Sequence, residues 1–106
     1  MHFLELLFTF FDDDIENAAE NGTKDFNQVM EIAAAEGQIK IVKLCKEFGA
    51  TNFNWAMENA AENGHIEIVK ILMTPWTKSK TRDAMARASE NGHIEIVKLL
   101  KEWRNL

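Results

Sequence analysis

The chain has 106 residues, which is enough for one domain at most. Charged residues make up 27% of the sequence and apolar residues 46%, a composition that excludes intrinsic disorder. The net charge of −5 disfavours nucleic acid as the main partner, and the single cysteine, Cys45, excludes an internal disulfide framework. We expect Cys45 to be a core thiol in a reducing compartment, the cytoplasm.

The first segment, residues 1–11, is strongly apolar, with three leucines and four phenylalanines. A span of a bilayer needs about 20 residues, so this segment is too short to be one. It also lacks the basic start and the cleavage site of a signal peptide. We expect a helix or strand packed on the first repeat, with a membrane or partner anchor as the alternative.

One sequence motif, Glu-Asn-Gly-His-Ile-Glu-Ile-Val-Lys, occurs at residues 62–70 and again at residues 90–98. A less similar copy covers residues 36–43. The glycines of the three copies, Gly37, Gly64 and Gly92, are 27 and 28 residues apart. A repeat period of about 20–50 residues is typical of a stacked array, in which one unit cannot bury its apolar face alone. Such arrays usually present surfaces rather than pockets.

The spacing predicts repeats at 26–52, 53–79 and 80–106, preceded by a half repeat at 12–25. Residues 16–22 repeat residues 58–64 almost completely, but Gly22 lies only 15 residues before Gly37. That distance leaves no room for a second helix between the two glycines.

Each copy is predicted to form two helices. In the second copy Asn54 is a candidate cap, Ala60 and Ala61 allow close approach of a neighbouring helix, and Gly64 ends the first helix in the left-handed conformation. The second helix is predicted from about residue 65 or 66 to residue 73, because Ile and Val recur at three- and four-residue spacing. The isoleucines also permit a strand, but the repeat context favours a helix.

The second and third copies are joined by a segment that departs from the repeat. Pro75 should end the second helix a turn early and leave residues 74–82 as the longest irregular connection. Three aromatic residues at equivalent positions are expected to be anchors: Phe48, Trp76 and Trp103. The basic run at residues 78–82 is interpreted as a solvated loop, or as a docking patch for an acidic partner.

The pattern Ala-Ala-x-x-Gly-His-x-x-Ile-Val-x-x-Leu at residues 60–72, echoed at 88–100, resembles the ankyrin repeat, and the resemblance covers residues 12–106. The period is about six residues shorter than the family's 33. The missing residues fall between Gly49 and Trp55, where ankyrin arrays project β-hairpin fingers. The resemblance therefore implies an all-α, ankyrin-like solenoid with shortened or absent fingers. Short, divergent copies of this kind look like those in ankyrin-like proteins of large DNA viruses, which implies the host cell's cytoplasm as the location.

The resemblance also implies a non-catalytic protein–protein interaction module that binds through the concave face of its first helices. Carried over by position, the candidate partner-binding residues are Glu20, Asn21, Glu36, Glu62, Asn63, Glu90, Asn91 and Trp55. Their carboxylates would form a ladder suited to a partner with a basic surface, since complementary charge tunes encounter rate and specificity. Alternatively, these side chains only solvate the helices.

The sequence predicts no enzyme, no cofactor and no metal site. His65 and His93 occupy equivalent positions, but stacked helices lie about 8–10 Å apart, whereas zinc ligands lie about 2 Å from the ion. We expect both to be turn residues that hydrogen-bond locally. Glu58 stands where the family has a partly buried histidine, so a raised pKa is conceivable there.

A second function remains open, that of a structural or oligomerising fragment of a longer repeat protein. Solenoid ends need polar caps for solubility, and the last helix carries a row of apolar residues: Ile94, Val97, Leu100 and Trp103. Self-association through this C-terminal end is the alternative to partner binding. Contact with membrane or nucleic acid is the least favoured reading, because only the basic run and residues 1–11 suggest it.

Overall fold

The structure, a computed structural model, describes residues 24–106. The apolar segment 1–11, nearly all of the half repeat, and the candidate residues Glu20 and Asn21 lie outside this range. The described chain forms helices and no strand: α3 (Lys24–Glu36), α4 (Ile39–Glu47), α5 (Phe53–Glu62), α6 (Ile66–Leu72), the 3₁₀ turn η1 (Lys78–Lys80), α7 (Thr81–Glu90) and α8 (Ile94–Arg104). The predicted all-α repeat fold without fingers is confirmed for these residues.

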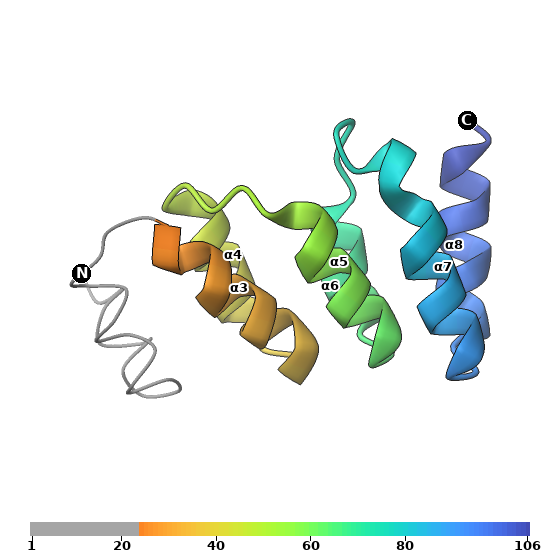
Figure 1. The fold of residues 1–106 in the computed structure, drawn as a ribbon, viewed down its shortest axis with the longest axis horizontal. Helices are drawn as coiled ribbons and strands as arrows, with labels where there is room; N and C mark the ends of the chain where they lie inside the picture. Colours follow the sequence, from red (N-terminus) through yellow and green to blue (C-terminus); the bar gives the residue numbers. More distant parts are fainter. Residues whose placement is uncertain (1–23) are drawn as a thin grey trace.

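The helices form two layers (Figure 1). The first helix of each pair, α3, α5 and α7, lies in the front layer, and the second helices, α4, α6 and α8, lie behind. Helix α5 packs closely against both α3 and α7, whereas α4, α6 and α8 touch one another much less. The front layer is therefore the more tightly packed of the two.

Small side chains make the close packing of the front layer possible. Ala33, Ala34, Ala60 and Ala61 are fully buried between neighbouring helices. The second helices supply larger apolar side chains to the same continuous core, among them Ile41, Val42, Ile68, Val69, Leu72, Ile96 and Leu100. Since interiors are close-packed, enlarging any of these alanines would push the helices apart.

Each first helix ends at the glycine of the repeat. Gly64 has φ +82°, and Gly37 and Gly92 have closely similar values. Around Gly64 the N–H of His65 donates to the Ala60 carbonyl at 2.9 Å, and the N–H of Gly64 donates to the Ala61 carbonyl at 3.3 Å. These two bonds define a Schellman cap, in which glycine adopts a backbone conformation that other residues disfavour. The predicted left-handed helix stop is confirmed.

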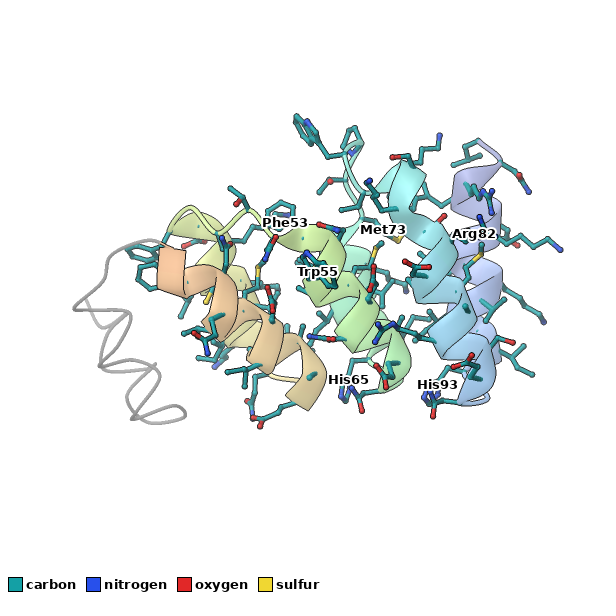
Figure 2. All side chains as sticks on the ribbon, viewed as in Figure 1. Phe53, Trp55, His65, Met73, Arg82 and His93 are labelled. Carbon is teal, nitrogen blue, oxygen red and sulfur yellow. The ribbon has the colours of Figure 1, made fainter. Side chains whose placement is uncertain are left out.

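The histidines that follow Gly64 and Gly92 each contact the preceding repeat. Nε2 of His65 lies 3.1 Å from the carbonyl oxygen of Ala35, and Nε2 of His93 lies 3.1 Å from that of Glu62. A carbonyl oxygen only accepts, so Nε2 is the protonated nitrogen in both rings. Figure 2 shows both histidines at the same end of the stack. The prediction of local hydrogen bonding was wrong, because each bond crosses to the previous helix pair.

The glycine makes room for this histidine. A Cβ built on Gly37 would lie 2.8 Å from Cε1 of His65, and one built on Gly64 would lie 2.7 Å from Cε1 of His93. No atom lies within 4 Å of a Cβ built on Gly92. Glycine is therefore required at positions 37 and 64 for two reasons. Its backbone adopts the positive φ angle, and its missing side chain leaves space for the histidine ring of the next repeat.

The connection after α6 departs from the other copies, as Pro75 predicted. Helix α6 ends at Leu72, whereas α8 continues four residues beyond the equivalent Leu100. The connection runs from Met73 to Lys80 and includes the 3₁₀ turn η1, so it is less irregular than predicted. Trp76 is 81% exposed, which makes its prediction as an anchor wrong. The early helix end leaves it on a turn that points away from the core.

Two smaller predictions also need correction. Asn54 is the second residue of α5 rather than its cap, and Asn52 occupies the N-cap position without a side-chain capping bond. Leu100 is fully buried and cannot form part of an apolar end, while Val97 and Trp103 are half-buried. Ile94 remains the exposed member of that row.

The glycine–histidine contact gives a testable difference between two otherwise similar glycines. Gly64→Ala and Gly92→Ala both force alanine into the left-handed region, which costs about 1–2 kcal/mol. Only Gly64→Ala also drives a methyl group into the ring of His93, so we expect it to lower the free energy of unfolding by a further ~1–3 kcal/mol. Urea denaturation followed by circular dichroism measures both.

The His93→Ala background supplies the control. There the difference between the two glycine variants should largely disappear, because the ring that opposes the methyl group is gone. Equal losses for the two variants in the wild-type background would contradict a steric role for the contact.

Candidate interaction surface

The candidate residues within 24–106 lie on or next to α3, α5 and α7. We call the solvent-exposed side of these three helices the first-helix face. Trp55 is 52% exposed on α5. Glu36 on α3 and Glu90 on α7 are also exposed, and Asn63 and Asn91 follow directly after α5 and α7. Five of the predicted residues are therefore exposed on or directly after the first helices of successive repeats, with Trp55 near the start of α5 and the other four at the C-terminal helix ends. An exposed tryptophan among polar residues is a typical feature of binding surfaces.

Glu62 differs from the other carboxylates because it forms an intramolecular ion pair. Nη1 of Arg87 lies 2.8 Å from Oε1 of Glu62, and Nε of Arg87 lies 3.7 Å from Oε1 of Glu58. Arg87 thus joins α7 to two turns of α5. The hydrogen bond to Glu62 is the main cause that raises the pKa of Arg87 above its usual value. The predicted ladder is interrupted in its middle, since the Glu62 carboxylate already has a basic partner.

Glu58 is the most buried carboxylate of the described residues, with 7% of its surface exposed. Loss of hydration on burial raises its pKa; the positive charge of Arg87 opposes that shift and the negative charge of Asp83 adds to it. The raised pKa that the sequence suggested is confirmed in direction. The arrangement explains it structurally, as a carboxylate held between two helices by one arginine.

The amides at the ends of α5 and α7 fold back on their own helices. Nδ2 of Asn63 donates to the carbonyl of Asn59, and Nδ2 of Asn91 donates to that of Arg87, both at 2.9 Å. Their amide oxygens remain available as acceptors at the surface. The two positions are identical in geometry, as the repeat predicts.

The junction between α3 and α5 is closed by a set of asparagine contacts. Oδ1 of Asn27 accepts from the backbone N–H groups of Thr51 at 2.6 Å and Asn52 at 3.1 Å. Nδ2 of Asn52 donates to Oε2 of Glu31 at 2.6 Å. We call the two bonds accepted by Asn27 the Asn27 bridge. It ties the chain before α5 directly to α3.

The junction between α5 and α7 is open at the same end. Two adjoining hollows of about 380 and 510 Å³ lie there and share Asn54 and Lys80; together we call them the α5–α7 groove. The first is lined by Thr51, Phe53, Asn54, Trp76, Thr77 and Lys80, and the second by Asn54, Trp55, Glu58, Ser79, Lys80, Arg82 and Asp83. Figure 2 shows Phe53, Trp55 and Arg82 toward this end of the stack, away from His65 and His93.

From the sequence we identified Trp55 and the basic run at residues 78–82 as separate candidates and did not predict that they line the same groove. Their link depends on Pro75 ending α6 early, so that Trp76 and Lys80 come to lie beside the start of α5. A proline next to a tryptophan, ahead of a basic run, was the signal for an exposed aromatic side chain.

Other kinds of site receive no support from the described residues. Cys45 is fully buried, and burial raises the pKa of its thiol to about 12, so it is a plain core thiol as predicted. Within residues 24–106 no group of three His, Cys, Asp or Glu side chains could hold a metal ion. No helix in that range has the length and apolar character needed to cross a membrane.

Paired helices stacked in two layers, with a glycine–histidine contact at each described junction, define a helical repeat solenoid. Residues 30–105 match the family described as ankyrin repeats (3 copies), so the chain belongs to the ankyrin repeat family. Searches of curated proteins and of solved structures gave no match. Ankyrin repeats generally mediate protein–protein interaction, and the family is typically a non-enzymatic interaction module.

The pKa of Glu58 predicts a pH-dependent effect of its replacement. Because the folded-state pKa is raised, protonated Glu58 contributes stability below its unfolded pKa, and this contribution is lost as pH rises through the folded value. Glu58→Gln keeps the side chain neutral at every pH. We expect it to raise the free energy of unfolding at pH 7 relative to wild type, with a smaller gain at pH 4.

Urea denaturation at the two pH values measures this effect, and Glu90→Gln is the matched control. Glu90 is exposed, so its replacement should change stability little at either pH. A gain from Glu58→Gln that is equal at pH 4 and pH 7 would show that desolvation does not govern this carboxylate.

Proposed function

We propose that the chain binds a partner protein through the first-helix face. The observation that carries the proposal is the half-exposed indole of Trp55 near the start of α5, the middle helix of that face, within a chain of ankyrin repeats. Tryptophan is enriched among the few residues that supply most of the energy of protein interfaces. A monomer gains nothing from leaving such a large apolar surface in water.

The exposed acids suggest the kind of partner. Glu36 and Glu90 sit at equivalent ends of α3 and α7 and are not paired with a basic side chain of the described residues. Glu62 between them is neutralised by Arg87. A partner with a basic surface would therefore meet one carboxylate at the end of α3 and one at the end of α7, with Trp55 near the start of α5, rather than a continuous ladder. The location that fits this function is the cytoplasm, where Cys45 stays reduced.

Peptides selected from a random display library against the purified chain provide the test. We expect the selected binders to be basic and to lose about tenfold or more in affinity for Glu36→Lys/Glu90→Lys, because complementary charge becomes repulsion. Trp55→Ala should weaken the same binders through loss of the aromatic contact. Isothermal titration gives the dissociation constants.

The matched control is the double charge reversal Glu95→Lys/Glu102→Lys, at exposed positions of α8. It changes the net charge equally but leaves the first-helix face intact. If the affinity of the binders falls as much for this control as for Glu36→Lys/Glu90→Lys, the binding surface lies elsewhere. The same conclusion follows if neither double reversal changes the affinity.

A second candidate function is self-association through α8, which rests on Ile94. Ile94 is 63% exposed, whereas the equivalent residue of the previous repeat, Ile66, is partly buried and packs against the hydrophobic core. Exposed large aliphatic side chains favour association when they can bury one another. The remaining exposed residues of α8 are mostly charged, which limits the apolar area available.

Molar mass by light scattering, over a concentration series, tests this second candidate. If Ile94 lies in a self-association surface, the wild-type mass should rise above that of the monomer with concentration, and Ile94→Glu should stay monomeric. A wild-type chain that is monomeric throughout would remove self-association and leave partner binding as the function.

A further inference from the structure

The α5–α7 groove lies beside the first-helix face but differs from it in chemistry. Its first hollow of about 380 Å³ has an apolar floor formed by the side chains of Phe53 and Trp76. The size falls in the range of sites that hold small ligands or single large side chains. Its second hollow reaches Trp55 on the first-helix face.

The two junctions of the stack show what the groove lacks. Asn54 on α5 is the positional equivalent of Asn27 on α3, each lying ten residues before the glycine of its repeat. Asn27 accepts two backbone N–H groups from the segment that precedes the next helix. The side chain of Asn54 makes no hydrogen bond to any described residue and faces the groove instead. At the second junction Asn54 thus presents the same side-chain amide, but no backbone N–H groups donate to it as those of Thr51 and Asn52 donate to Asn27.

Trp76 is held in place although its side chain is exposed. The N–H of Thr77 donates to the carbonyl of Thr74 at 3.0 Å and closes a four-residue turn with Pro75 and Trp76 at its centre. Proline is favoured at the second position of such turns. The buried hydroxyl of Thr77 accepts from the N–H of Thr74 at 2.8 Å and lies 3.0 Å from the carbonyl oxygen of Leu72, to which it donates. The backbone that carries the indole is therefore fixed in a turn, which reduces the backbone entropy lost on binding.

The exposed edge of the groove is basic. Lys80 lines both hollows and Arg82 lines the second, and neither is paired with a carboxylate of the described residues. Of the two acids in the lining, Glu58 is buried beside Arg87, which leaves Asp83 as the exposed one. Lys78 adds a further positive charge on η1. An incoming segment would thus meet more positive than negative charge here, although the whole chain is negative.

We propose that the α5–α7 groove binds an extended, acidic segment of a partner protein, with one bulky apolar side chain seated against Phe53 and Trp76. The amide oxygen of Asn54 accepts a backbone N–H of that segment, as Asn27 does within the chain. Carboxylates of the segment pair with Lys80 and Arg82. This inference rests on protein binding as the function but places a second contact, of opposite charge preference, beside the first-helix face.

The probe is the synthetic peptide acetyl-Asp-Glu-Asp-Phe-Asp-Glu-Asp-amide, titrated into the ¹⁵N-labelled full chain. The chain has three tryptophans, and each indole N–H gives its own resonance. We expect the resonances of Trp55 and Trp76 to shift and that of Trp103 on α8 to stay fixed. Affinity should fall as salt rises, because the charges are exposed and screened.

Three variants locate the contacts. Trp76→Ala should weaken binding about tenfold, as expected for an aromatic anchor, and Lys80→Glu/Arg82→Glu should abolish it. Asn54→Ala should weaken it by a smaller factor. The matched control Lys98→Glu/Lys101→Glu, at exposed positions of α8, should bind as wild type. Circular dichroism confirms that each variant folds.

The peptide itself supplies two further controls. Replacing its phenylalanine by alanine should remove the shift at Trp76, and replacing its acids by lysine should remove binding. Equal binding of the lysine peptide, a shift at Trp103 alone, or no loss on Trp76→Ala would each overturn the proposal. So would binding of Trp76 to phosphatidylserine vesicles without binding to the peptide, because the turn would then be a membrane contact.

The outcome is separable from that of the proposed function. The reversal Glu36→Lys/Glu90→Lys leaves the groove lining intact, so it should not weaken the acidic peptide. Failure of the acidic peptide, together with basic library binders that still depend on Glu36 and Glu90, would remove the groove proposal alone.

Discussion

The contact between the glycine of one repeat and the histidine of the next is the constraint on which the stack depends. It needs the absence of a side chain at Gly64, the presence of a ring at His93, and the carbonyl left over at the end of α5. Helix ends leave carbonyl groups without partners inside the helix, and here the next repeat supplies a donor. The same contact recurs between Gly37 and His65, so it sets the distance and rotation between successive helix pairs.

Because this contact fixes one end of both junctions within residues 24–106, the differences between these junctions appear at the other end. The Asn27 bridge closes the first junction there, whereas Asn54 leaves the second open. The cause is local: Pro75 ends α6 early, and the chain then enters a 3₁₀ turn before α7. The Lys80 N–H donates to the Thr77 carbonyl inside that turn, and so it is not available to Asn54. The repeat pattern thus explains the helical stack, and its interruption after α6 explains why the second junction has a groove.

The fold could be predicted because its main determinants are local or periodic. The glycines, the paired alanines and the isoleucine stripe mark each helix and its end within a few residues. The partners of His65, Asn27 and Glu62 could not be predicted in the same way. Each is satisfied by a residue 24–30 positions away in the next or previous repeat, and a repeat pattern alone does not say which side chain reaches across.

The candidate site was predictable to the same limited extent. Position within the repeat placed Glu36, Glu90 and Trp55 on the first helices of successive repeats, because the repeat marks where each of these helices begins and ends. It could not show that Glu62 is neutralised, because the positions equivalent to Arg87 hold Asn59 and Ile32, so the repeat predicts no basic side chain there. Nor could it show Trp76 exposed, because the aromatic residue at the equivalent positions is covered to different extents in each copy.

The open junction also connects recognition with stability. In repeat proteins each unit contacts only its neighbours, so stability is a sum of unit and junction contributions. The second junction has Arg87 and the His93 contact but lacks the Asn27 type of bridge. A segment bound in the α5–α7 groove would contact α5 through Phe53 and Asn54, the connection after α6 through Trp76, and the start of the following repeat through Lys80. It would therefore complete the junction as well as occupy a site, and its binding energy would add to the stability of the third helix pair.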